Sequence, residues 1–129
     1  MYNAGFENSR MRELAITYPD LAADLQAIIH RVFDLLPLAR QHYYHPDMLG
    51  SWSIKAVLPT IAPELSYDDL EVSHGMMAME SFAELMRPET TIERREHLQA
   101  ALLKYCERDT WAMVRIAHFF QQGVNYAIQ

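Results

Sequence analysis

The chain has 129 residues, half of them hydrophobic and 22% charged, a composition typical of one folded globular domain and not of a disordered segment. Its formal net charge of -6 argues against binding of nucleic acid by bulk electrostatic attraction, although a bound cation would reverse the charge of an acidic site. The single cysteine, Cys106, cannot form an internal disulfide, which favours a cytoplasmic protein, and no apolar run approaches the ~20 residues needed to cross a membrane.

Apolar residues recur at helical spacing through the first third of the chain. They predict one helix over 6–18 and another over 21–32, with a proline between them. Two further prolines bracket a short third helix, expected over 38–44. Evidence for strands is thin: it consists of a stub at 1–2 and the stretch 31–35, neither of which could form a sheet unaided.

Three more helices are predicted in the rest of the chain. A short helix over 54–58 follows two serines that can cap it, within a loop-rich stretch. The next helix is expected over 75–86, with Ser73 as its cap. Thr90 and Glu93 have the spacing of a capping box and predict the start of a long helix, which continues to a glycine near the end of the chain. The elements together predict a mainly α protein.

Three residues are candidates for chemistry. Tyr105 and Asp109 are four residues apart on the long helix, so they share one helical face, one turn apart. Glu7 falls in the first turn of the first helix, where the helix dipole favours a carboxylate. Taken alone, each has a simpler explanation: Glu7 as a capping acid, Tyr105 as part of a helix face and Asp109 as a surface residue.

Four short motifs follow one another in an order that is more specific than any of them alone. They resemble the C-terminal part of the DnaQ-like (DEDD, tyrosine-type) 3'-5' exonucleases, which have a ribonuclease H-like fold. The chain is most similar to an uncharacterised bacterial family of that fold, often joined to RecB-like and similar nuclease domains. The resemblance covers essentially all of 1–129, which is therefore expected to be the C-terminal portion of one such domain. The motifs are YNAGFENSRMRELA, HPDMLGSWSIKAVLPTI, LSYDDLEVSHGMMAM and LLKYCERDTWAMVRI.

The resemblance implies a role for each candidate residue. Glu7 matches the second acidic motif, where most relatives have an aspartate that binds metal, and Asp109 matches the metal-binding aspartate of the third motif. Tyr105 matches the tyrosine that hydrogen-bonds the attacking water. Two divalent ions, Mg²⁺ or Mn²⁺, would activate that water and stabilise the leaving oxygen of a DNA or RNA substrate. Asn3 and Lys55 match recurring positions to which the motifs assign no chemistry.

The chain departs from the superfamily at its start. The first motif, an Asp-x-Glu on the opening strand, does not precede Tyr2. The resemblance therefore implies a helical remnant of a ribonuclease H-like α/β fold, with the central strands largely missing. Two carboxylates hold two ions weakly, so we expect the isolated chain to be an inactive or nearly inactive fragment of an exonuclease. The alternative is a non-catalytic helical module that binds a partner protein or, through its apolar faces, forms a homodimer.

Three other features have structural explanations. His42 and His45 could be zinc ligands, but no cysteine or acidic residue stands at matching spacing, and a surface pair is favoured. Cys106 lacks a base at suitable spacing and is expected to be a buried thiol. Core packing is the favoured explanation for a group of methionines, with an adaptable partner surface as the second. These are Met76, Met77, Met79 and Met86.

Overall fold

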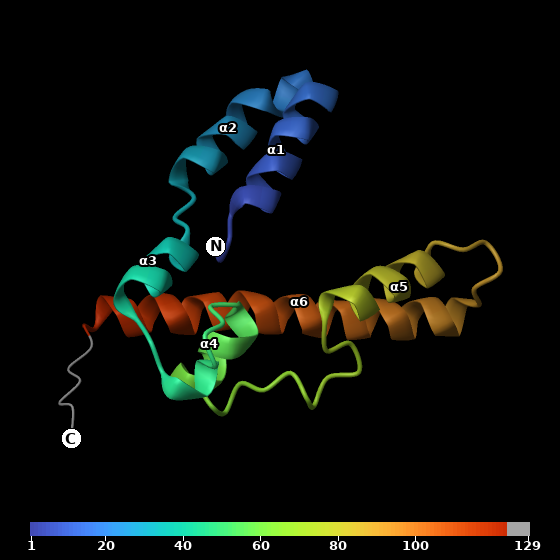
Figure 1. Cartoon of the computed structure of the whole chain (residues 1–129). Helices are drawn as coiled ribbons and strands as arrows, with labels where there is room; N and C mark the ends of the chain where they lie inside the picture. The colour runs from blue at the N-terminus through green and yellow to red at the C-terminus, as the bar shows by residue number, and fades with distance from the viewer. Residues whose placement is uncertain (124–129) are drawn as a thin grey trace. The chain divides into compact units, whose positions relative to one another are not determined.

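The computed structural model describes residues 1–123 and is mainly α-helical, which confirms the predicted fold class (Figure 1). These residues contain no strand. None of the described helices has both the length and the apolar character of a membrane span. The chain divides into two compact units, the second of which begins at Leu58. The helices are α1 (Gly5–Thr17), α2 (Ala22–Arg31), α3 (Leu35–His42), α4 (Ile54–Ile61), α5 (Gly75–Leu85) and α6 (Ile92–Gln121), with 3₁₀ turns η1 (Pro19–Leu21) and η2 (Pro46–Met48).

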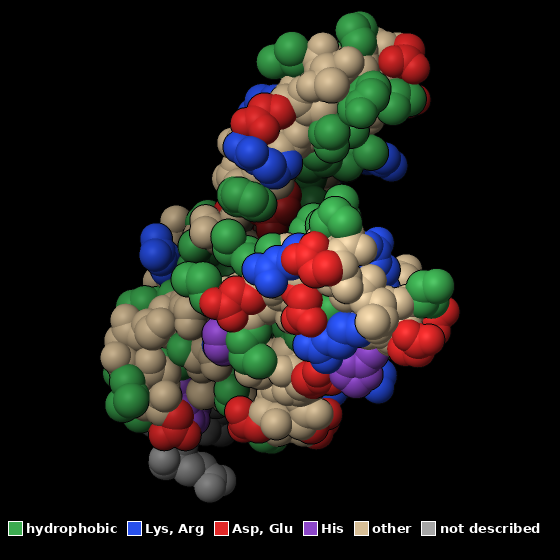
Figure 2. Space-filling model, turned by 90° about the vertical axis from the view of Figure 1, so that its right-hand side faces the viewer, with side chains coloured by type: hydrophobic (Ala, Val, Ile, Leu, Met, Phe, Trp, Pro, Cys, Tyr) green, Lys and Arg blue, Asp and Glu red, His purple; other side chains and the backbone are tan. Residues whose placement is uncertain are grey.

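In the first unit, α1 and α2 form a helical hairpin in which they lie side by side (Figure 1). Pro19 ends α1 and opens η1, as predicted, because a proline cannot continue the helix. No residue over 5–31 is buried, and the space-filling view shows apolar side chains on the surface of this hairpin (Figure 2). The exposed large apolar residues are Phe6, Leu14, Ile16, Tyr18, Leu21 and Ile28.

Asp34 links the start of the chain to α3. Its carboxylate accepts the backbone N–H groups of Asn3 at 2.8 Å, Ala4 at 2.9 Å and Leu36 at 3.0 Å. Because Asp34 caps α3, this helix begins three residues before the predicted start at 38 and ends before the predicted 44. Pro37 lies in the first turn of α3, where its missing N–H costs no helical hydrogen bond.

The two stretches predicted as strand candidates lie next to each other. The backbone nitrogen of Met1 donates to the carbonyl of Phe33 at 2.7 Å, and the N–H of Leu35 donates to the carbonyl of Met1 at 2.9 Å. Met1 thus bonds to Phe33 and Leu35, the residues on either side of Asp34, which is the hydrogen-bond pattern of neighbouring parallel strands. The pairing is too short to be a strand, but it sets the direction of the chain on both sides of the α1–α2 hairpin.

The N-cap residue was predicted correctly for α4 but not for α5. Ser53 caps α4, as predicted, because its hydroxyl oxygen accepts the N–H of Ala56 at 3.2 Å. The prediction of Ser73 as the cap of α5 is wrong. His74 takes that position, and its Nδ1 accepts the N–H of Met77 at 3.3 Å. The two candidates are adjacent in sequence, and only the backbone geometry decides between them.

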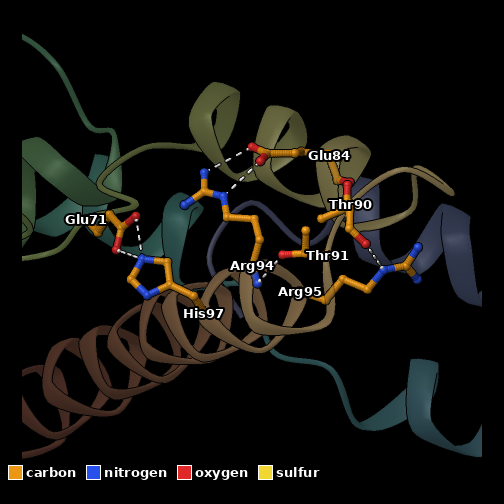
Figure 3. A network of polar contacts seen from close by, with 7 residues as sticks. All are labelled: Glu71, Glu84, Thr90, Thr91, Arg94, Arg95 and His97. Carbon is orange, nitrogen blue, oxygen red and sulfur yellow. Dashed lines mark hydrogen bonds and ion pairs between the residues drawn. The ribbon is translucent and has the colours of Figure 1, made fainter.

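A polar network joins the end of α5 to the start of α6 (Figure 3). The hydroxyl oxygen of Thr91, and not that of the predicted Thr90, caps α6 by accepting the N–H of Arg94 at 3.2 Å. Thr90 instead donates its hydroxyl to the carbonyl of Glu84 at 2.5 Å. Arg94 binds both carboxylate oxygens of Glu84, at 2.8 and 3.1 Å, and Arg95 donates to the carbonyl of Thr90 at 3.0 Å. Arg94 therefore fastens α6 to α5, and Arg95 fastens α6 to the loop between the two helices.

The long helix α6 supplies much of the core of the second unit. Leu98, Ala112 and Ile116 are buried on it, and α5 packs along its first half (Figure 1). The prediction that Cys106 is buried is wrong, since its side chain is exposed. The prediction of core packing is also wrong for three of the four methionines. Their side chains are exposed, because no other described element covers this face at α5. They are Met76, Met79 and Met86, each more than 60% exposed.

Candidate functional site

Glu7 lies in the first turn of α1, directly after the segment that pairs with 33–35. Asn3 adopts a left-handed backbone conformation with φ of 61°, which asparagine tolerates better than most residues, and so turns the chain from this segment into α1. The N-cap residue of α1 is Ala4, which has no capping side chain, and Glu7 is the acidic residue of the first turn.

One carboxylate oxygen of Glu7 lacks a partner. Oε2 is buried and accepts no hydrogen bond from the described residues, and the same holds for Oδ1 of the neighbouring Asn8. A buried polar atom without a partner is costly, and such atoms are uncommon in folded proteins. A carboxylate oxygen is a hard ligand of the kind that Mg²⁺ and Mn²⁺ prefer. The environment of Glu7 therefore fits the metal that the motif implies.

Tyr105 and Asp109 lie one turn apart on α6, as predicted, and their side chains are hydrogen-bonded to each other. The structure adds a third residue to this pair. The hydroxyl of Tyr67 donates to Oδ1 of Asp109 at 2.5 Å. The rings of Tyr67 and Tyr105 are inclined by 59°, with 6.1 Å between their centroids. Two phenol groups, one from α6 and one from outside it, therefore contact the same carboxylate.

Both phenols remain protonated at neutral pH. Burial is the largest cause that raises the pKa of Tyr67, followed by its hydrogen bond to Asp109 and the negative charge of that carboxylate. Burial also raises the pKa of Tyr105, and the charge of Asp109 and the hydrogen bond to it add to the effect. Neither tyrosine is therefore a general base, and both act as hydrogen-bond donors.

The segment 62–73, which carries Tyr67, is fastened along α6 by a series of polar contacts. The start of the segment contacts Arg115, its middle contacts Arg108 and Asp109, and its end contacts His97, so the segment and α6 run in opposite directions. This register brings Tyr67 opposite Asp109, and one of the contacts is visible at the left of Figure 3. In order, Glu64 contacts Arg115 at 2.5 Å, Ser66 contacts Arg108 through its carbonyl, Tyr67 contacts Asp109, Asp69 contacts Arg108 at 3.0 Å, and Glu71 contacts His97 at 2.8 Å.

The predicted site residues belong to different units. Glu7 lies in the first, whereas Tyr105 and Asp109 lie in the second. Within residues 1–123, no group of three or more histidine, cysteine or acidic side chains is arranged to hold a metal ion. That Glu7 and Asp109 meet at one metal site stays a prediction. His45 has a structural role, because its Nδ1 accepts the N–H of Asp47 at 3.2 Å in η2.

A pocket of about 650 Å³ opens in the first unit beside Asn3. Trp52 is held in its wall by two hydrogen bonds. Its carbonyl accepts the hydroxyl of Tyr2 at 2.6 Å, and its indole N–H donates to the carbonyl of Tyr43 at 2.9 Å. Burial is the main cause that raises the pKa of Tyr2, to about 12, so this hydroxyl also acts as a donor. Of the two recurring positions without assigned chemistry, Asn3 lines the pocket, and Lys55 is exposed on α4.

Comparison with known proteins identifies similar chains without assigning an activity. Residues 1–53 match the family described as "Domain of unknown function (DUF2779)". "Uncharacterized protein UU173" of Ureaplasma parvum is 28% identical over 98% of this chain and 21% of its own length. "Uncharacterized protein MG366 homolog" of Mycoplasma pneumoniae is 33% identical over 97% of this chain and 21% of its own length. No solved structure matches the chain.

The chain thus spans about a fifth of the length of the curated relatives that it matches. Because each match covers at least 97% of the chain, the similarity includes both compact units and is not limited to the first 53 residues. In these relatives, regions similar to the two units occur together within a longer protein.

Proposed function

We propose that the chain is the part of a cytoplasmic, metal-dependent 3'-5' exonuclease that carries its second and third acidic motifs. The observation that carries this proposal is the environment of Glu7. Its Oε2 is buried and has no hydrogen-bond partner among the described residues. Glu7 also comes shortly after Met1, which pairs in parallel with 33–35. Glu7 lies beyond the carboxyl end of this short pairing, in the first turn of α1.

The pair on α6 supports the same proposal. Asp109 supplies a second carboxylate. The hydroxyl of Tyr105, one turn away, is hydrogen-bonded to that carboxylate, and its oxygen can accept a hydrogen bond that orients a water molecule. When bound, two divalent ions would activate the attacking water and stabilise the leaving oxygen. Glu7 and Asp109 would hold these ions through hard oxygen atoms. Two carboxylates leave most of the coordination to water, so the remaining ligands must come from outside these motifs.

The test compares the chain alone with a joined protein, in which a strand-forming segment bearing Asp-x-Glu from a tyrosine-type exonuclease precedes Met1. The substrate is a 5'-labelled single-stranded DNA or RNA oligonucleotide with Mn²⁺. We expect the joined protein to shorten the oligonucleotide from its 3' end and the chain alone to leave it intact, because only the former has four acidic ligands. A joined protein with a helical circular dichroism spectrum and no degradation of either substrate would contradict the proposal.

The exposed face of α5 favours a second candidate, a helical module that forms a homodimer. Four apolar side chains at spacings of three and four lie on this face, and methionines adapt to varied partner surfaces. We expect light scattering at micromolar concentration to show a dimer and Met79→Glu to show a monomer, because the charge would be buried at the interface. A monomeric wild-type chain would remove this candidate. The four are Met76, Met79, Phe82 and Met86, between 56% and 70% exposed.

A further inference from the structure

We propose that Tyr67 is a positioning residue, which fixes the carboxylate of Asp109 in an orientation suited to holding a divalent cation. This inference rests on the proposed function, since it assigns a partner to the same site. The Tyr67 side chain is only 8% exposed, and its hydroxyl lies 2.5 Å from Oδ1 of Asp109. Residues that hydrogen-bond to a metal ligand orient it and tune its affinity for the metal.

The geometry leaves the carboxylate able to bind a cation. A tyrosine hydroxyl donates one proton, whereas a carboxylate offers about four acceptor directions on its two oxygens. Tyr67 uses one of these directions on Oδ1 of Asp109, and the hydrogen bond from Tyr105 uses a second, which leaves about two for a cation. An aspartate on a helix otherwise has several side-chain rotamers, and a hydrogen bond from a buried neighbour selects one of them.

The position of Tyr67 is itself fixed from both sides. Arg108 donates to the carbonyl of Ser66, immediately before Tyr67, and to both carboxylate oxygens of Asp69 at 3.0 Å, two residues after it. Arg108 also precedes Asp109 in the chain, so the same turn of α6 holds the segment and carries the carboxylate. A site holds its ligands accurately when the residues that support them are themselves locked in place.

A purely structural role for the same hydrogen bond makes a different prediction. If the hydroxyl only anchored the segment 62–73, then any other anchor of that segment would matter equally. Arg115 is such an anchor, since it contacts Glu64 at 2.5 Å and lies six residues from Asp109. The two roles can therefore be separated by comparing Tyr67→Phe with Arg115→Met.

The experiment uses the complete chain and Mn²⁺ alone, and follows the paramagnetic broadening of the nuclear magnetic resonance signals of Tyr105. This measurement suits weak binding and needs no catalytic activity. We expect Tyr67→Phe to raise the Kd for Mn²⁺ by ~10-fold or more, as loss of a hydrogen bond to a ligand does elsewhere. We expect Arg115→Met, and Tyr18→Phe at an exposed tyrosine, to leave the Kd unchanged.

Two results would overturn the inference, and they differ in what they leave standing. If Asp109→Asn abolishes the broadening but Tyr67→Phe does not alter the Kd, or alters it no more than Arg115→Met does, Tyr67 is not a positioning residue and the proposed function stands. If the wild type shows no broadening at Tyr105, or Asp109→Asn leaves the broadening intact, the cation site is absent. The proposed function then fails together with the role of Tyr67.

Discussion

Asparagine in place of Asp109 is expected to slow 3'-5' degradation by the joined protein by a factor of ~10² or more, which corresponds to the loss of several kcal/mol of charge stabilisation. Asparagine has the size of aspartate and keeps an oxygen that can accept a hydrogen bond from the hydroxyl of Tyr67. In the wild type this hydroxyl lies 2.5 Å from Oδ1 of Asp109. The substitution therefore keeps the size of the side chain and the hydrogen bond from Tyr67, and it removes the negative charge that a divalent ion requires. The measurement is the initial rate at which a 5'-labelled oligonucleotide is shortened with Mn²⁺.

Glu107→Gln is the matched control for this substitution. Glu107 is exposed on the same helix, two residues before Asp109, so the substitution removes one charge without touching the cluster. We expect its rate to stay within about twofold of the wild type, because exposed charges are screened by salt. Equal rates for Glu107→Gln and Asp109→Asn would show that Asp109 does not act in the reaction.

The positions of the helices in this chain can be predicted from short-range sequence patterns, but their exact ends cannot. The predicted helix over 6–18 is α1 to within one residue at each end, because periodicity and Pro19 act locally. The start of α3 was predicted too late because its cap, Asp34, is also held by the backbone of Asn3, 31 residues earlier. A contact between distant parts of the chain decided this boundary.

The candidate site shows the same division between local and distant effects. Tyr105 and Asp109 could be paired from their spacing, since one helix carries both. Tyr67 donates to a residue 42 positions away, from a segment without helical periodicity, so no sequence spacing relates the two. The methionines of α5 were misassigned for a related reason. The spacing of the methionines shows which side chains share a face of the helix, but not whether another element covers that face.

Alanine in place of Asp34 is expected to lower the free energy of unfolding by about 3 kcal/mol, since it removes a charged acceptor of three hydrogen bonds. The backbone N–H groups of Asn3, Ala4 and Leu36 would all lose their partner. The last two of these bonds are partly buried, so water replaces the carboxylate only incompletely. Loss of the cap also weakens the start of α3. Urea denaturation followed by helical circular dichroism measures the change.

Asp24→Ala provides the comparison at an exposed acid in the same unit. Asp24 lies in the first turn of α2, and its loss is expected to change the free energy of unfolding by no more than about 0.5 kcal/mol. If the two alanine variants were equally stable, the three hydrogen bonds of Asp34 would not contribute to the fold.

The carboxylate of Asp34 also makes stability depend on pH, in a direction that its pKa determines. Burial opposes ionisation, but the three backbone hydrogen bonds and the ammonium group of Met1 outweigh it and lower the pKa of Asp34 below its ordinary value of 3.8. Because the folded pKa lies below the unfolded one, the stabilisation is complete above pH 3.8 and is lost as the pH falls through the folded value. The stability difference between the wild type and Asp34→Asn is therefore expected to be constant near neutral pH and to shrink in acid. A difference that grew on acidification would mean that the folded protein favours the protonated acid, contrary to the three hydrogen bonds that its ionised form accepts.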